Sequence, residues 1–515
     1  MHSILRCFAA VAALTITAPA AAEWREASTD HFLIYADSGE RWLKTFADNL
    51  ERSAAALDKL HPSQDRTASK SNRVVIYAIS GTGAVEKLCG KCGSVAGFYI
   101  PRVGHSVAYT ARTPASSEWG ISSDIVLFHE YAHHFLLSSS NGALPRWYNE
   151  GFAEFFSTIR TQPDGTVEIG RPAKHRAYNV LNADMKIEQL LDSTGRRDDM
   201  SQDIFYGRAW VLTHMLTFSK DRRGQLTKYL EAINRGPPNL DAAREAFGDL
   251  NALRRQMEDY VRKPILSLRL PADMVKVGPV SLRPLSPGEA AMMPVRLRSD
   301  RGVSRKQALE ILPEARKRSA PFASDPAAQV VLAEAEYDAG NDAEAEAASD
   351  RALAVDPKNI EALMYKGRAR IRRARTAGSR DPAVWSEARG WFVKANRADP
   401  DAAEPLQLFY ESFEAAGQQP TKNAALGLYR SLELSPQDPG LRIMTARQYV
   451  VDGQLAAARA TLLPLAYDPH IPAEKNRFTR VVEAIDAKRP IAKILKLGSG
   501  AADSAAGDGD TSDAK

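Results

Sequence analysis

The chain has 515 residues, of which 44% are hydrophobic and 25% charged, and its formal net charge is +5 at pH 7. This length allows two or three domains with cores of their own, and the balance of apolar and charged residues is that of a globular protein. A charge this small and this mixed in sign offers no basic surface to a nucleic acid, so we expect no such partner.

The first residues have the layout of a secretory signal. Arg6 precedes a short apolar run that ends in the small residues Ala20, Ala21 and Ala22. The run is shorter than the roughly 20 residues that span a bilayer, so cleavage after Ala22 is favoured over an N-terminal membrane anchor. No later segment is long and apolar enough to cross a membrane. The sequence therefore predicts a signal peptide at 1–22 and a soluble, exported protein, periplasmic or secreted.

Cleavage would leave two cysteines, Cys89 and Cys92, in the segment LCGKCG. In an oxidising compartment the expected state of such a pair is a disulfide. A redox centre is the alternative, but the pair lacks a clear strand-to-helix context, and a zinc ribbon would need a second pair of cysteines. We therefore predict a structural disulfide.

Four segments before residue 112 have the composition of strands, and one has the period of an amphipathic helix. The strands are predicted at 31–37, 73–80, 97–101 and 105–111, and the helix at 41–60. The last two strands would form a pair that turns at Arg102-Val103-Gly104. From Ser122 the pattern is helical as far as about Val261, with Ser122 or Ser123 as the N-cap of its first helix.

The segment Phe128–Leu136, FHEYAHHFL, contains the motif H-E-x-x-H at His129, Glu130 and His133. Residues four apart share a helix face, so both imidazoles can reach one metal ion, with Glu130 at the edge of that face. Zinc suits imidazole ligands and an open coordination position. His134 points away from this face and is predicted to be structural. Because buried histidines are common on amphipathic helices, the motif alone does not decide the matter.

A second predicted helix, RWYNEGFAEFF at 146–156, supplies a third candidate ligand. Sixteen residues separate Glu150 from His133, and the Asn141-Gly142 pair between them can turn one helix back on the other. Two histidines and a carboxylate with one open position describe a hydrolytic zinc site. We therefore predict one Zn²⁺ ion held by His129, His133 and Glu150.

HEYAHH followed by WYNEGFAEFF resembles the gluzincin metallopeptidases, the clan of thermolysin and the alanyl aminopeptidases. The resemblance covers roughly residues 24 to 262 in layout and is sharp over 128–156 and again near 205–215. It implies an α+β zincin-like catalytic domain in which His129, His133 and Glu150 are the ligands. It also implies that Glu130 is the general base that takes a proton from zinc-bound water.

The resemblance also suggests groups that orient the ligands. Glu154 follows Glu150 by one helical turn, and in thermolysin-like sites an acid at this spacing orients the first histidine, here His129. Asn149 could do the same for His133. Two alternatives stay open: Glu154 is a solvated helix residue, or it is the ligand and Glu150 the orienting group.

Peptide hydrolysis also needs a donor that stabilises the oxyanion. The segment 205–216, FYGRAWVLTHML, loosely resembles the helix on which aminopeptidase relatives place a catalytic tyrosine, and Tyr206 matches that tyrosine. Arg208 and Ala209 replace the lysine and glycine of the family pattern. A packing role is the alternative for Tyr206 and is favoured for His214, the second candidate for the same task.

The strand pair before the zinc helix stands where zincins place the edge strand that holds an extended substrate by backbone hydrogen bonds. Nothing in the chain resembles the G-x-M-E-N motif with which the aminopeptidases grip a substrate amine. Endopeptidase activity is therefore the default expectation.

The C-terminal third contains an internal repeat. An alanine stands twelve residues before a proline four times, at Ala345/Pro357, Ala388/Pro400, Ala424/Pro436 and Ala457/Pro469. This pattern resembles the tetratricopeptide repeat, in which small alanines let paired helices approach closely and the proline stops the second helix. A generic alanine-rich bundle is the alternative. Because such solenoids bind proteins or peptides, we expect a protein partner here.

The predicted fold is an α+β zincin-like domain followed by an all-α tetratricopeptide-repeat solenoid. The predicted function is an exported zinc metallopeptidase that hydrolyses peptide bonds in a protein or peptide substrate. A peptidase-like scaffold acting through its repeats and a hydrolase of a non-peptide amide are the alternatives. The predicted parts are a signal peptide (1–22), the metallopeptidase domain (23–262), a connector with two strands (263–303), the repeat domain (304–487) and a disordered tail (488–515).

Overall fold

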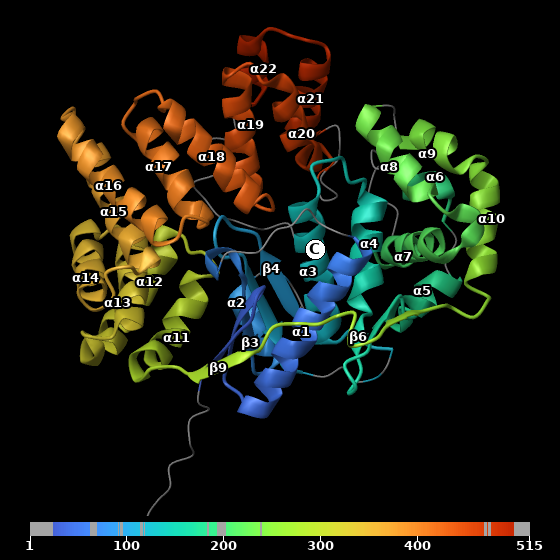
Figure 1. Cartoon of the computed structure of the whole chain (residues 1–515), viewed down its shortest axis with the longest axis horizontal. Helices are drawn as coiled ribbons and strands as arrows, with labels where there is room; N and C mark the ends of the chain where they lie inside the picture. The colour runs from blue at the N-terminus through green and yellow to red at the C-terminus, as the bar shows by residue number, and fades with distance from the viewer. Residues whose placement is uncertain are drawn as a thin grey trace, which may run out of the picture.

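The computed structural model describes residues 24–498 except 62–69, 91, 93–95, 114–116, 118, 183–184, 193–201, 237–238, 468–470 and 472–474. The predicted signal peptide and residues 499–515 of the predicted tail lie outside this range. An N-terminal α/β part is followed by stacked helix pairs, which confirms the predicted fold class (Figure 1). Within the described residues, no helix combines the length and apolar character needed to span a bilayer.

A six-stranded sheet forms the centre of the N-terminal part. Its strands lie in the order β4 (Gly97–Ile100), β5 (Val107–Ala111), β3 (Val74–Ile79), β2 (Phe32–Ala36), β1 (Arg25–Ser28) and β9 (Ser281–Pro284). β2, β3 and β5 are parallel, whereas β4 pairs antiparallel with β5 at the edge. The four strands predicted from the pattern are β2 to β5, which this arrangement confirms.

Alternate residues of the strands give the sheet two apolar faces. Phe32 and Ile76 face α1 and α3, while Tyr35 and Tyr77 belong to a second core that includes Met293 of α11. One face is therefore covered by helices of the N-terminal part, and the other by the first helix of the repeats together with α2 (Thr82–Cys89). These helices are α1 (Glu40–Leu60), α3 (Ser123–Ser139) and α11 (Pro287–Ser299).

Helices build most of the remaining N-terminal part. The prediction of helical structure throughout 122–261 is wrong over ten residues, where β6 (Arg160–Thr161) and β7 (Val167–Ile169) form a hairpin that β8 (Leu268–Leu270) extends. The turn follows from Asp164 and Gly165, the latter with φ of 81°. The helices are α2 (Thr82–Cys89), α4 (Arg146–Ser157), α5 (Ala177–Asn182), α6 (Ile187–Leu191), α7 (Gln202–Phe218), α8 (Gln225–Arg235), α9 (Asn239–Phe247) and α10 (Leu250–Tyr260).

Helix pairs make up the C-terminal part. The two helices of a pair meet at a tight turn with one residue at positive φ, such as Gly340 at 88°, a conformation that glycine adopts without strain. The pairs are α11 with α12 (Arg305–Ser319), α13 (Pro326–Asp338) with α14 (Asp342–Val355), α15 (Ile360–Thr376) with α16 (Pro382–Ala398), α17 (Ala403–Ala415) with α18 (Lys422–Leu434), α19 (Pro439–Val451) with α20 (Leu455–Ala466), and α21 (Arg477–Asp486) with α22 (Ile491–Gly498).

The repeat alanines lie where helices touch. Ala345, Ala388 and Ala424 are almost fully buried, as close packing of paired helices requires. In the fourth copy Ala458 is the buried residue, one position after the predicted Ala457. Ala457 itself is half-buried, and its predicted partner Pro469 lies outside the described residues.

Two boundaries of the predicted division are wrong. Residues 287–299, assigned to the connector, form α11, in which Pro287 occupies the first turn, where a missing N–H costs nothing. Residues 491–498, assigned to the tail, form α22, because Ile494 is buried against the neighbouring repeat helices. The helical repeats therefore begin before residue 304 and continue beyond 487.

Candidate metal centre

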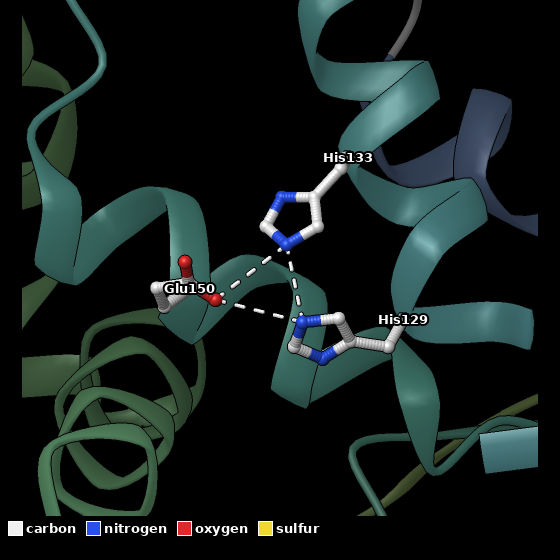
Figure 2. Close-up of side chains that lie close together, drawn as sticks. All are labelled: His129, His133 and Glu150. Carbon is white, nitrogen blue, oxygen red and sulfur yellow. Dashed lines mark hydrogen bonds and ion pairs between the residues drawn. The ribbon is translucent and has the colours of Figure 1, made fainter. Parts of the chain in front are cut away.

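Helix α3 carries the first two candidate ligands. It begins where the Ser122 hydroxyl accepts a hydrogen bond from the Ile125 amide at 3.1 Å, as predicted for the N-cap. His129 and His133 lie one turn apart and point to the same side, with 3.1 Å between their Nε2 atoms (Figure 2). The helix period alone accounts for this approach.

Helix α4 brings the third group to the same point. Gly151 lets α4 lie close to α7, because a Cβ there would come within 2.6 Å of the Ala209 carbonyl oxygen. The preceding residue, Glu150, is 1% exposed, and its Oε2 lies 3.5 Å from the Nε2 atoms of both His129 and His133 (Figure 2). The structure thus brings together the three predicted ligands.

The donor atoms fit a metal ion. His133 Nδ1 lies 2.9 Å from Asn149 Oδ1, and His129 Nδ1 lies 3.5 Å from Glu154 Oε1. An oxygen beside Nδ1 favours the tautomer in which Nδ1 carries the proton of the neutral ring, and Nε2 then presents a lone pair to a metal ion. Zinc–nitrogen bonds of about 2.0–2.1 Å place tetrahedral ligand atoms about 3.3–3.4 Å apart, close to the spacing found here. Two lone pairs and a carboxylate oxygen therefore form a candidate cation site.

The electrostatics of this cluster favour a cation. Burial alone would lower the pKa of His133, but the Glu150 carboxylate raises it to about 9. Burial would likewise raise the pKa of Glu150, whereas the two histidines hold it well below its usual range. Glu150 is therefore anionic at neutral pH, and a divalent ion would take the place of the proton that it attracts to His133.

Glu154 contacts the cluster through Nδ1 of His129, the ring nitrogen that is not among the three converging ligand atoms. It is 1% exposed and receives hydrogen bonds from His175 Nε2 at 3.0 Å and from Arg176 at 2.7 and 3.3 Å. Burial would raise the pKa of Glu154, but these partners lower it to about 2. The alternative of a solvated Glu154 is therefore wrong. Its carboxylate lies beside Nδ1 of His129, not Nε2, and this geometry favours Glu150 as the ligand.

His175 and Arg176 were missed in the sequence. They come from the 3-10 turn Lys174–Arg176, which precedes α5. The run Lys-His-Arg was the available signal, but it lies outside both motif helices, and nothing in its spacing points to Glu154.

Tyr206 of α7 lies beside the cluster. Its ring centroid is 6.1 Å from that of His129, and the Arg176 guanidinium lies 5.2 Å from its ring. Burial and the charge of Glu150 raise the pKa of Tyr206 above its ordinary value. The hydroxyl is therefore protonated at neutral pH and able to donate a hydrogen bond.

Two further histidines have packing positions. His134 Nδ1 lies 2.6 Å from the Tyr99 hydroxyl, and burial lowers the pKa of this imidazole to about 4. His214 is fully buried, with Nδ1 2.8 Å from the Tyr260 hydroxyl and Nε2 2.9 Å from the Gly170 carbonyl oxygen. Neither imidazole belongs to the three-residue cluster.

Strand β4 lies along α3. A Cβ on Gly97 would be 3.3 Å from the Val126 side chain of that helix, and Tyr99 of the strand bonds to His134. Among the described strands β4 is at the edge of the sheet, with β5 on one side. Before it, Cys89 and Cys92 are joined by a disulfide at the end of α2.

No protein-family model matches this chain, and no curated protein sequence matches it. Among solved structures, it is similar to TTC0263, a thermophilic TPR protein in Thermus thermophilus, with 18% identity over 37% of this chain and 92% of that chain and a TM-score of 0.27. It is also similar to the MamA RS-1 ArsTM double mutant, with 14% identity over 34% of this chain and 91% of that chain and a TM-score of 0.26.

Proposed function

We propose that this chain is an exported, periplasmic or secreted, zinc metallopeptidase that cleaves peptide bonds within protein or peptide substrates. The convergence of His129 Nε2, His133 Nε2 and Glu150 Oε2 carries the proposal. The Cys89–Cys92 disulfide supports export, because such bonds persist in oxidising compartments.

The residues around the cluster supply the remaining chemistry. A bound zinc ion would polarise the scissile carbonyl and lower the pKa of water. Glu130, part-exposed and next to His129 on α3, would accept the proton of the attacking water and pass it to the leaving amine. Tyr206 would donate a hydrogen bond to the oxyanion. The open edge of β4 would hold an extended peptide through backbone hydrogen bonds.

Substitutions of two neighbouring histidines, one a candidate ligand and one not, test the metal site. His133→Gln is expected to remove stoichiometric zinc, because it deletes one of three ligands, whereas His134→Gln is expected to retain it. The measurement is metal content by mass spectrometry after dialysis against zinc. Equal zinc content in the two variants would contradict the assignment of the ligands, and absence of zinc from the wild type would contradict the site as a whole.

Tyr206→Phe is expected to lower kcat about a hundredfold while KM changes little, because a donor to the oxyanion acts in the transition state. A packing tyrosine would lose stability instead, with kcat nearly unchanged. Peptide hydrolysis and thermal melting of the same preparation separate the two roles.

A further inference from the structure

The stacked helix pairs of the repeats, α11 to α22, curve around the N-terminal part and turn their inner side toward it (Figure 1). There the repeats hold the turn between β4 and β5. Gln437 Nε2 donates to the Arg102 carbonyl at 3.2 Å and lies 3.3 Å from the Ser106 hydroxyl, and the Gly104 amide donates to the Ser435 hydroxyl at 3.4 Å. Such contacts to the backbone of an extended turn are those by which a groove holds a peptide.

The charges of the two surfaces are complementary. A cavity of about 430 Å³ remains between them, and six carboxylates and two guanidinium groups of the repeats line it, so the repeat side carries an excess of acidic groups. The turn contributes Arg102 and His105, the latter 3.8 Å from Glu361. Gly104 has φ of 85° and lies where a Cβ would be 3.3 Å from Glu404, so the turn fits closely. The carboxylates are Asp300, Glu334, Asp338, Glu361, Glu404 and Asp438, and the guanidinium groups are those of Arg296 and Arg368.

A second contact lies next to this turn, just before β3. Asn72 Nδ2 donates to the Asp401 carbonyl at 2.7 Å, and Asn72 Oδ1 accepts from the Ala403 amide at 3.3 Å. Ser71 donates to Asp399. The loop between α16 and α17 therefore contacts the end of the sheet at which the parallel strands β3 and β5 begin.

The repeats also reach the metal-bearing helix. Arg442 of α19 donates through Nη2 to the carbonyls of Leu137 and Ser140 at 2.9 and 3.1 Å, at the C-terminal end of α3. The repeats thus contact α3, which bears two of the candidate ligands, at its end, and they contact β4, which lies along α3, through its turn.

We propose that the repeats act on their own chain: the acidic groove that ends at Gln437 recognises the basic turn Arg102–Ser106, and this contact positions β4 beside the metal centre. Gln437 is then a positioning residue for the strand that receives substrate. The separate protein partner predicted for the repeats would have to bind outside this groove. The role given to β4 rests on the proposed peptidase function, whereas the contact itself does not.

Gln437→Ala in the full chain tests the proposal. We expect amide hydrogen exchange in β4, Gly97–Ile100, to become about fivefold faster, as for the loss of one hydrogen bond. KM for a peptide library substrate should rise by a similar factor, with kcat and zinc affinity unchanged. Gln418→Ala is the matched control, because Gln418 bonds Arg389 within the repeats, and it should alter none of these.

Arg102→Gln keeps the carbonyl that Gln437 bonds but removes the positive charge that the turn presents to the repeat carboxylates, and it is expected to have the same effect on β4. Unchanged exchange in β4 in both variants, or faster exchange confined to the turn, would overturn the proposal. Faster exchange in β4 without hydrolysis by any variant, the wild type included, would keep the contact and reject the peptidase function.

Discussion

Glu130→Gln is expected to lower kcat/KM for peptide hydrolysis about a thousandfold to ten-thousandfold while zinc remains bound. Glutamine keeps the shape of the side chain but cannot accept the proton of the attacking water, which is the contribution of a general base. Glu130 is not one of the three groups whose atoms converge, so its replacement leaves the ligand set intact. Steady-state hydrolysis of a quenched fluorescent peptide, together with metal analysis of the same sample, measures both quantities.

Glu150→Gln is the matched control, because it makes the same chemical change at a ligand. It is expected to lose zinc and activity together, since an amide oxygen is a weaker ligand than a carboxylate. Full activity of Glu130→Gln would contradict the role of Glu130. Zinc binding with no hydrolysis by the wild type would favour the alternative of a peptidase-like scaffold.

The candidate ligands could be predicted because the information that places them is local. His129 and His133 are related by the helix period, and Ser122 fixes where that helix begins. Predicting Glu150 as a ligand also required that its helix fold back on the first one, and the pair Asn141-Gly142 indicated the turn. The helix period alone does not say which residue of the second helix is a ligand. The resemblance of its segment NEGFA to a metallopeptidase motif singled out Glu150.

The groups behind the ligands could not be predicted, because tertiary packing alone places them. His175 and Arg176 reach Glu154 from a short 3-10 turn whose sequence has no periodicity. Strand β1, REAS, escaped detection because its polar residues resemble a loop, although Ala27 is fully buried between its neighbours. Helix α11 was hidden by the prolines at its start and middle.

The relation between the two parts was also invisible in the sequence. The repeat array, for which the sequence predicts a protein partner, also packs on one face of the sheet, where the Tyr109 hydroxyl donates to the Leu297 carbonyl at 2.8 Å. Buried residues of α19 to α22, such as Val450 and Leu462, belong to the same apolar core as α3 and α4. The repeats are therefore a structural component of the part that bears the candidate metal centre.

Arg442→Met is expected to destabilise the chain by about 1.5–3 kcal/mol, the range for hydrogen bonds to a charged group whose loss leaves buried carbonyls without a donor. Arg442 is 1% exposed and also donates to the carbonyls of Pro436 and Thr461. The carbonyls of Leu137 and Ser140 at the end of α3 depend on it, since the last carbonyls of a helix have no partner within the helix. Its positive charge also stabilises the negative end of the helix dipole.

Arg447→Met on the same helix is the matched control. Arg447 is 67% exposed and pairs with Glu414 at 3.0 Å, so its loss should cost less than about 1 kcal/mol. Urea unfolding followed by tryptophan fluorescence measures both changes, and hydrogen exchange in Ser123–Ser139 shows where protection is lost. Because Arg442 holds the end of α3 that lies beyond His133, we expect exchange to accelerate there first. Equal midpoints for the two variants would show that the hydrogen bonds of Arg442 are not needed to hold the end of α3.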